Sequence, residues 1–245
     1  MTGTVTGLWR HPIKSHGREA LKRADFIAGQ TMPGDRVWAV AHEKSHADGT
    51  EWVPCAHFTR IAKVPQLMAI TARVRGDEVT LSHPERPDLT FAPDREAQLF
   101  LDWVAPLMPP DRAASARIVR VPGRGMTDAD FPSVTLCNMA SHRAVEGRLG
   151  RDLSIHRWRG NVWFDGLPLW EEFDWIGREI RIGEVLFRVR ERTTRCTATM
   201  ANPETGTRDA DTLAVLSEWG HQDFSVQAEV VEGGEIRIGD EVIPQ

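Results

Sequence analysis

The segment 179–189, EIRIGEVLFRV, alternates apolar and polar side chains on both sides of a Gly-Glu pair. Successive side chains of a β-strand point to opposite faces, so this pattern predicts two strands joined by a tight turn. Other short runs predict strands at 37–41, 67–74 and 78–81, and a second hairpin at 230–238 around Gly233-Gly234. The fold class is therefore predicted to be mainly β (α+β), a barrel with a few helices.

Helix signals are confined to three segments. The segment 94–104 follows a proline and opens with a capping aspartate, 141–149 stops at Gly150, and 211–219 carries an apolar stripe and stops at Gly220. Residues 105–132 are rich in Pro, Gly, Arg and Asp, which is typical of a boundary between domains. We therefore expect two domains, residues 1–115 and 116–245.

Composition narrows the class of protein. The 245 residues are 41% hydrophobic and 27% charged, which is ordinary for a globular chain. A net charge of −5 indicates no affinity for nucleic acid, and no apolar run approaches the length of a membrane span. Cys55, Cys137 and Cys196 cannot all pair, and the N-terminus shows no signal peptide, so we expect reduced thiols in a cytoplasmic protein.

Shortly after the hairpin, the segment 195–206, RCTATMANPETG, places Cys196 beside Arg195. A thiol next to a fixed positive charge ionises more readily, and the thiolate attacks electrophiles or binds soft metals. Thr194 and other threonines nearby add hydroxyl groups, and the Asn-Pro-Glu-Thr-Gly run predicts a tight turn. The alternative is a small buried core residue, the usual fate of a free cysteine.

Two N-terminal motifs offer groups suited to an anion. In HPIKSHG at 11–17, Lys14 and Ser15 supply an ammonium, a hydroxyl and N–H groups after a proline that fixes the backbone. Arg36 ends a Gly-Asp-Arg turn and is a second candidate for binding phosphate. The alternatives are an ordinary exposed loop for the first motif and a local ion pair for the second.

A third motif, RWRGN at 157–161, contains two arginines that would share one face of an extended chain. Arg159 could bind phosphate, and the Asn161 amide could read the edge of a heterocycle. The alternative is a pair of surface arginines. A zinc site is disfavoured because the possible ligands match no common spacing; they are His42, His46, Cys55 and His57.

Taken in order, these motifs resemble those of the MOSC family, in the group with an N-terminal MOSC β-barrel domain that includes the mitochondrial amidoxime-reducing component and bacterial MOSC reductases. The resemblance covers nearly the whole chain, with His11 where the family has Tyr and Asn202 where Asp is usual. The matching motifs are PIKS at 12–15, GDRVW at 34–38, WRGN at 158–161, EEFDW at 171–175, RC at 195–196, PETG at 203–206 and GDEV at 239–242.

The resemblance implies a MOSC β-barrel preceded by an N-terminal MOSC-type β-barrel domain. It also implies the molybdenum cofactor (Mo-molybdopterin), with Cys196 as the protein ligand to molybdenum and Arg195 beside it in the catalytic pair. The contacts to phosphate and pterin expected from it are Lys14, Ser15, Arg36, Arg159, Asn161 and Thr194. Asn202 removes a negative charge near the cysteine, so a proton role for that position is not carried over.

The leading functional hypothesis is an oxidoreductase, independent of pyridoxal phosphate, that removes oxygen from N-hydroxylated or S-oxide small molecules by two-electron oxygen-atom transfer. The chain has no C-x4-C-x2-C cluster for an iron–sulfur centre, so a separate electron-donor protein is expected. The alternative is a non-catalytic carrier of the cofactor, or a sulfur carrier that uses a persulfide on Cys196. A third hypothesis is a domain whose site has lapsed.

Overall fold

The computed structural model describes residues 2–244 and is dominated by a β-barrel. Seven strands follow one another around the barrel in the order β10-β9-β13-β12-β11-β15-β1, and antiparallel pairing of β1 with β10 closes it. Strand β2 (Glu19–Leu21) extends the sheet beyond β1. The barrel strands are β1 (Gly3–Arg10), β9 (Val134–Asn138), β10 (Val162–Asp165), β11 (Glu179–Ile182), β12 (Val185–Thr194), β13 (Asp223–Glu232) and β15 (Glu241–Pro244).

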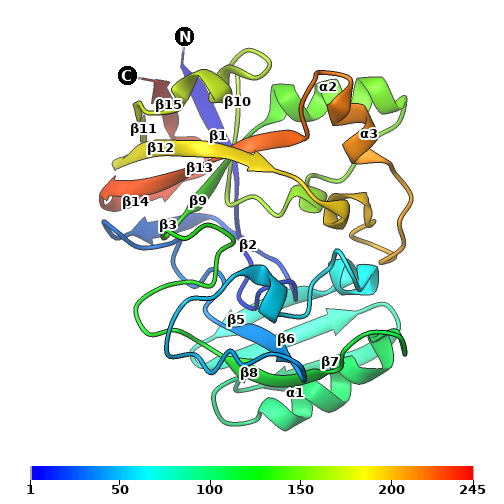
Figure 1. Ribbon diagram of the computed structural model, residues 1–245. Coiled ribbons are helices and arrows are strands. Elements are labelled where there is room, and N and C mark those ends of the chain that lie inside the picture. The colour runs from blue at the N-terminus through cyan, green and yellow to red at the C-terminus, as the bar shows by residue number, and fades with distance from the viewer. Residues whose placement is uncertain (1, 245) are drawn as a thin grey trace.

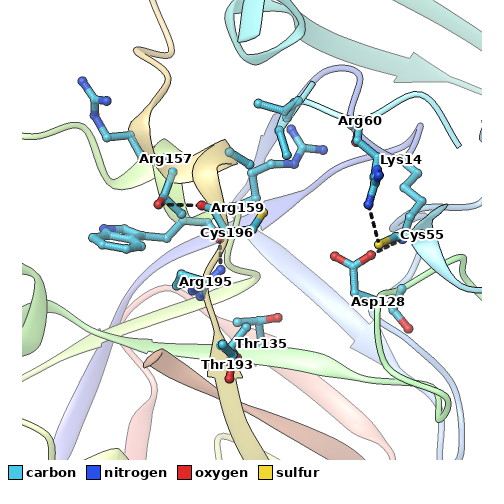
Figure 2. Close-up of a pocket in the computed structure, with 18 of the residues that line it drawn as sticks. Lys14, Cys55, Arg60, Asp128, Thr135, Arg157, Arg159, Thr193, Arg195 and Cys196 are labelled. Carbon is cyan, nitrogen blue, oxygen red and sulfur yellow. Dashed lines mark hydrogen bonds and ion pairs between the residues drawn. The ribbon is translucent and has the colours of Figure 1, made fainter. Parts of the chain in front are cut away.

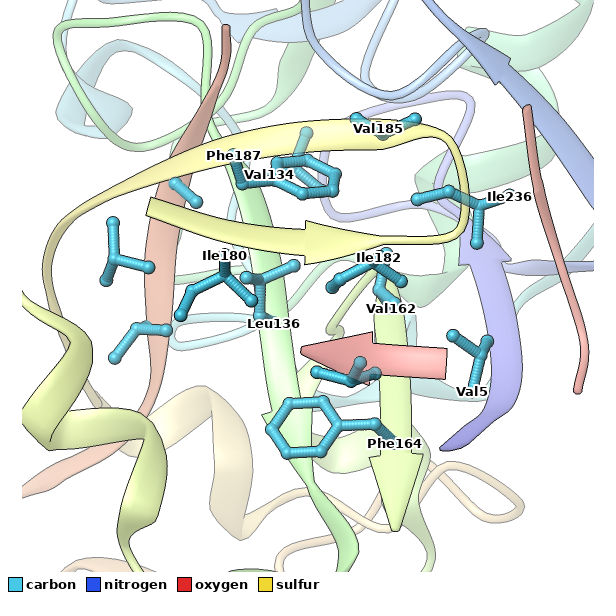
Figure 3. Packing of buried hydrophobic residues seen from close by; sticks show 14 of the residues in the cluster. Val5, Val134, Leu136, Val162, Phe164, Ile180, Ile182, Val185, Phe187 and Ile236 are labelled. Carbon is cyan, nitrogen blue, oxygen red and sulfur yellow. The ribbon is translucent and has the colours of Figure 1, made fainter. Parts of the chain in front are cut away.

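Apolar side chains from every strand of the barrel fill its interior (Figure 3). Ile180 and Ile182 of β11 and Val185 and Phe187 of β12 are fully buried, whereas Arg181 and Arg188 are not. Each such side chain contributes roughly 1.5–3 kcal/mol when it leaves water. The alternation in 179–189 therefore fixes which face of the hairpin enters the core, and the predicted mainly β fold is confirmed.

The first predicted hairpin is confirmed, and the second is wrong. Strands β11 and β12 pair around Gly183, which adopts a left-handed φ of 55°. After β13, however, strand β14 (Gly234–Arg237) pairs with β3 (Arg23–Phe26) instead of folding back on β13. Gly233 permits this crossing, because a Cβ there would lie 2.6 Å from the Phe26 carbonyl oxygen.

The rest of the N-terminal region forms a separate layer below the barrel in Figure 1. Strand β4 (Ala39–His42) pairs with β8 (Ser115–Val119), and a second sheet contains β5 (Thr71–Arg75), β6 (Glu78–His83) and β7 (Arg86–Phe91). Helix α1 (Ala97–Val104) packs its buried Phe100 and Trp103 against this layer. Strand pairing crosses the expected boundary at 115/116, because β1 and β3 pair with C-terminal strands.

Two local predictions in this layer need correction. The predicted strand 67–74 begins only at Thr71, because a 3-10 helix occupies Pro65–Ala69 with its proline in the first turn. Asp94 is not a helix cap: its carboxylate accepts hydrogen bonds from Trp38 Nε1 (2.8 Å) and Arg120 Nη1 (2.9 Å). The Asp94 side chain is therefore used in tertiary contacts and does not cap the helix. Helix α1 begins at Ala97, three positions after Asp94.

The other two helices lie beside the barrel (Figure 1). Helix α2 (Met139–Leu149) ends at Gly150, whose φ of 66° confirms the predicted C-terminal glycine. Helix α3 (Thr212–Ser217) begins after Asp211, whose carboxylate accepts from the Ala214 N–H, and it ends before the predicted residue 219. None of the helices described for residues 2–244 has the length and apolar character needed to cross a membrane.

Candidate functional site

A pocket of about 240 Å³ lies where the loop after β12 meets the N-terminal layer (Figure 2). Both parts of the chain supply walls, since residues 60–62 face the segment 193–199. Most of the residues predicted for the site line this one pocket, although they come from four separate segments of the chain. They are Lys14, Ser15, Arg36, Arg159, Thr194, Arg195 and Cys196.

Cys196 is exposed and stands at the end of β12, where the chain turns into a short 3-10 helix, Thr197–Met200. Its carbonyl oxygen accepts hydrogen bonds from the N–H (3.2 Å) and the hydroxyl (3.1 Å) of Thr199. These bonds fix the backbone while leaving the thiol on the pocket surface. The alternative of a buried core cysteine therefore does not hold for Cys196.

Arg195 fixes the loop next to that thiol. Its guanidinium donates to the Phe224 carbonyl through Nε (3.0 Å) and Nη2 (2.8 Å), and to the Trp158 carbonyl through Nη1 (2.8 Å). Burial lowers the pKa of Arg195 to about 10, so the group still carries its charge at neutral pH. The side chain thus supplies a fixed positive charge near Cys196, with most of its donors occupied by backbone carbonyls.

Three residues of the pocket hold left-handed backbone conformations that only glycine adopts without strain. Ser15 has φ 65°, Arg36 has φ 49° and Arg159 has φ 50°, and these are three of the five such non-glycine residues in 2–244. Each conformation costs of the order of 1–3 kcal/mol and concentrates at functional sites. The strain turns three polar residues toward one cavity, which indicates a built binding site.

The cations of the pocket are only partly satisfied. Arg36 pairs with Asp35 and donates to the Arg159 carbonyl (3.1 Å). Arg159 donates through Nη1 to the Gly17 carbonyl (3.3 Å), but its Nη2 is enclosed and has no hydrogen-bond partner within residues 2–244. Burial, followed by the nearby Arg36 charge, lowers the pKa of Arg159 to about 9. An enclosed, unpartnered N–H on a cation is a donor that an anionic ligand would satisfy.

Lys14 is buried beneath the same pocket. Its Nζ donates to the Met126 carbonyl (2.7 Å) and to Asp128 (2.5 Å), and burial lowers its pKa while Asp128 opposes the shift. An ammonium group has three N–H donors, so one remains for a ligand. Thr194 also lines the pocket, but its hydroxyl donates to Asp223 (2.7 Å).

Asn161 does not line the pocket. Its Oδ1 accepts from the Thr135 N–H (3.1 Å) and its Nδ2 donates to the Trp9 carbonyl (3.1 Å), and the residue is 1% exposed. The Asn161 amide therefore links strand β1, through Trp9, to strand β9, through Thr135. The structure does not support the prediction that Asn161 contacts the ligand, because its hydrogen-bonding groups are turned into the protein.

The expected extended chain around Arg157 is also wrong. Residues 155–158 form a 3-10 helix, and both arginines still line the pocket because Arg159 takes the left-handed conformation that ends it. Arg157 is buried and donates to the Met200 carbonyl (3.0 Å) and to Asp209. The Asp209 carboxylate also accepts a hydrogen bond from Asn202 Nδ2 (2.8 Å). An aspartate at position 202 would have no N–H to donate in this bond. This network clamps the loop that carries Cys196.

Sequence reasoning missed three residues on the opposite wall of the pocket. Figure 2 shows Cys55, Arg60 and Asp128, together with the predicted Lys14, facing the group around Cys196. Cys55 was considered only as a zinc ligand, yet within 2–244 no three His, Cys, Asp or Glu side chains are grouped to hold a metal. No local signal marks these residues, because folding of the N-terminal layer brings them to the pocket.

Two family models match this chain. The model of the MOSC domain matches residues 126–243, and that of the MOSC N-terminal beta barrel domain matches residues 2–103. The chain belongs to the MOSC family. The two matches leave 104–125 between them, within the Pro- and Gly-rich segment that the sequence marks as a boundary.

Relatives of this MOSC protein are distant. Mitochondrial amidoxime-reducing component 1 of Mus musculus is 24% identical, with the match spanning 98% of this chain and 82% of the relative. The same protein of Danio rerio is also 24% identical, over 83% of this chain and 70% of the relative. A molybdenum cofactor sulfurase of Drosophila grimshawi is 32% identical over 105 residues, which is 42% of this chain and 12% of that protein.

The fold also has a solved counterpart. The crystal structure of the YuaD protein from Bacillus subtilis matches 99% of this chain and 94% of its own, with a TM-score of 0.50 and 15% identity. At this identity the likeness concerns the fold alone.

Proposed function

We propose that this MOSC protein is a reductase that binds the molybdenum cofactor and removes oxygen from N-hydroxylated or S-oxide small molecules. One observation carries the proposal: the same pocket is lined by the exposed Cys196 thiol and by Arg159. The enclosed Nη2 of Arg159 has no hydrogen-bond partner within residues 2–244. A thiolate suits a soft metal, and a guanidinium fork suits a phosphate. The donor set therefore fits a ligand that carries both.

Within this proposal each residue has a distinct task. Arg159, Arg36 and Ser15 would bind the phosphate end, and the third N–H of Lys14 would add a further donor. Arg195 would hold the loop that carries the Cys196 sulfur in place through its hydrogen bonds to the Phe224 and Trp158 carbonyls. When bound, the cofactor would supply the two-electron oxygen-atom transfer. Amidoxime-reducing components are named for the same kind of substrate, which supports this choice of reaction.

The experiment is reconstitution of the purified protein with molybdenum cofactor and a chemical reductant, followed by assays with benzamidoxime and a sulfoxide. We expect turnover by the wild type and loss of turnover in Cys196→Ala. The matched control is Cys137→Ala, which removes a buried thiol that does not line the pocket. Absence of turnover in the wild type, or equal turnover in Cys196→Ala, would refute the proposal.

Electrons would come from a separate donor protein. The three cysteines at 55, 137 and 196 have no iron–sulfur spacing, and the given sequence contains no G-x-G-x-x-G motif for a dinucleotide. Adding NADH alone should therefore give negligible reduction of the loaded protein. Efficient reduction by NADH without any partner would contradict this part of the proposal.

A carrier function is the second proposal, and the similarity to a molybdenum cofactor sulfurase favours it. The exposed Cys196 could then hold a persulfide, or the pocket could pass the cofactor to an acceptor enzyme. Bound cofactor that transfers to an acceptor without turnover would support a carrier. A mass gain of one sulfur atom on Cys196 would support sulfur transfer.

A further inference from the structure

A second, smaller cavity of about 150 Å³ lies beside the pocket, and Arg60 lines both. Lys63, Arg112 and His42 also line it, and among residues 2–244 no aspartate or glutamate does. The cavity is therefore a basic extension of the pocket, joined to it at Arg60, and Cys196 does not line it. Neither the sequence motifs nor the proposed cofactor contacts involve it.

Two of the three cations around this cavity form no ion pair within residues 2–244. Arg60 donates to Cys55 Sγ (3.5 Å), and it forms no ion pair with any carboxylate of residues 2–244. Lys63 forms none either in that range, and Arg112 has only its exposed neighbour Asp111, at 3.5 Å. His42 Nε2 contacts the Ala56 carbonyl (3.0 Å), while its enclosed Nδ1 has no hydrogen-bond partner in the described part of the chain. Like charges gathered without a counter-charge favour an anion between them.

Arg60 also faces the main pocket, where the nearby carboxylate is already committed. Asp128 pairs with Lys14, so it does not neutralise Arg60. The guanidinium therefore offers a planar fork at the boundary of the two cavities, opposite the Cys196 wall in Figure 2. Such a fork matches the two oxygens of a carboxylate or a phosphate.

We propose that the substrates of this protein carry an oxyanion, a carboxylate or a phosphate group, which Arg60 binds while Lys63 and Arg112 reinforce the positive field. The reducible end of the substrate would then lie toward Cys196. This inference rests on the proposed reductase function and goes beyond it by naming the class of substrate. The binding step is electrostatic, so it weakens as salt is raised.

The test compares substrates that differ in one charge. The loaded protein is assayed with 4-carboxybenzamidoxime and with its neutral, similarly shaped partner 4-carbamoylbenzamidoxime. We expect kcat/KM to favour the carboxylate roughly tenfold, through KM, as one charge-assisted hydrogen bond would give. A 4-phosphono arm separates the two sources of oxyanion, since a larger preference there points to phosphate esters.

Variants locate the preference. Arg60→Gln should bring the carboxylate-to-carbamoyl ratio close to unity, and Arg60→Lys should retain part of it. If Arg60→Gln does not fold, Lys63→Gln and Arg112→Gln should each lower the ratio by a smaller factor, because both side chains are exposed. Arg75→Gln is the control, because this exposed arginine of β5 lines neither cavity. Its ratio should match that of the wild type.

A binding measurement separates failure of this inference from failure of the proposed function. Cofactor-free protein is titrated calorimetrically with the products 4-carboxybenzamidine and 4-carbamoylbenzamidine. We expect the carboxylate to bind more tightly than the carbamoyl compound to the wild type, and we expect this difference in affinity to be lost in Arg60→Gln. If no amidoxime is turned over, the reductase proposal fails and the titration alone decides the inference. Turnover with equal kcat/KM for both substrates, or titrations that show no preference, would overturn the role of Arg60.

Discussion

Two cysteines lie near the Arg195 charge in opposite surroundings. Cys137 is in strand β9 and is 0% exposed, and burial raises its pKa to about 12 despite the neighbouring guanidinium. Cys196 is exposed on the pocket loop. A nearby positive charge therefore does not by itself make a thiol available. Whether the thiol is exposed depends on where the cysteine lies in the barrel, inside a strand or beyond its end.

The same contrast extends to the polar groups around each thiol. In the barrel region, buried Glu172 accepts hydrogen bonds from Asn138 Nδ2 (2.9 Å) and Ser141 Oγ (2.8 Å). In the pocket, Arg159 Nη2 has no hydrogen-bond partner and Arg60 forms no ion pair with a carboxylate, as far as residues 2–244 are concerned. The buried Glu172 carboxylate thus has partners where water cannot reach it, whereas the pocket leaves donors for a ligand.

The largest expected effect is in thiol alkylation. At pH 8 a thiol with a pKa near 12 is ionised to roughly one part in ten thousand, and Cys137 is also shielded. Iodoacetamide should therefore modify Cys196 at least about a thousandfold faster than Cys137. Mass spectrometry of the folded Cys55→Ser protein measures both rates, and unfolded protein is the control. Comparable rates in the folded protein would abolish the contrast.

The next effect concerns the pH dependence of stability. Burial raises the pKa of Glu172 to about 7, so the folded state binds this proton more tightly than the unfolded state does. The contribution of Glu172 to the free energy of unfolding should therefore fall as pH rises from 4.5 to 7, by as much as about 3 kcal/mol, and then level off. Urea unfolding at several pH values measures the difference in free energy of unfolding between the wild type and Glu172→Gln, and the other titrating groups cancel in this difference. A difference that does not vary with pH would contradict the raised pKa of Glu172.

A smaller effect tests how tightly Cys137 is enclosed. A Cβ on Gly160 would lie 2.2 Å from the Cys137 sulfur, so Gly160→Ala should destabilise the fold by about 1–3 kcal/mol. Adding Cys137→Ala should recover part of that loss. The control is Gly147→Ala in helix α2, where nothing lies within 4 Å and about 1 kcal/mol should be gained. Equal urea midpoints for wild type and Gly160→Ala would show that the barrel wall is looser than described.

Local signals predicted those parts of the fold that local chemistry controls. The alternation in 179–189 gave the β11–β12 hairpin its register, and Gly150 and Asp211 marked two helix ends. The partner of β14 could not be predicted, because its pairing with β3 joins segments from the two ends of the chain.

The candidate site divides in the same way. Motif chemistry predicted the residues around Cys196, and the structure brings all of them except Asn161 to one pocket. Cys55 and Arg60 could not be predicted, because they belong to no motif and reach the pocket through packing of the N-terminal layer. The structure places Asn161 outside the pocket, and its motif could not show this because an amide suits a ligand and a strand junction equally well.

Molybdenum retention tests the central claim most directly. Wild type, Cys137→Ala, Cys196→Ala and Arg159→Gln are loaded with cofactor, passed through gel filtration and analysed for metal. The account predicts stoichiometric molybdenum in the wild type and in Cys137→Ala, and strongly reduced metal in Cys196→Ala and Arg159→Gln. Full retention by Cys196→Ala, with loss in Cys137→Ala, would contradict it.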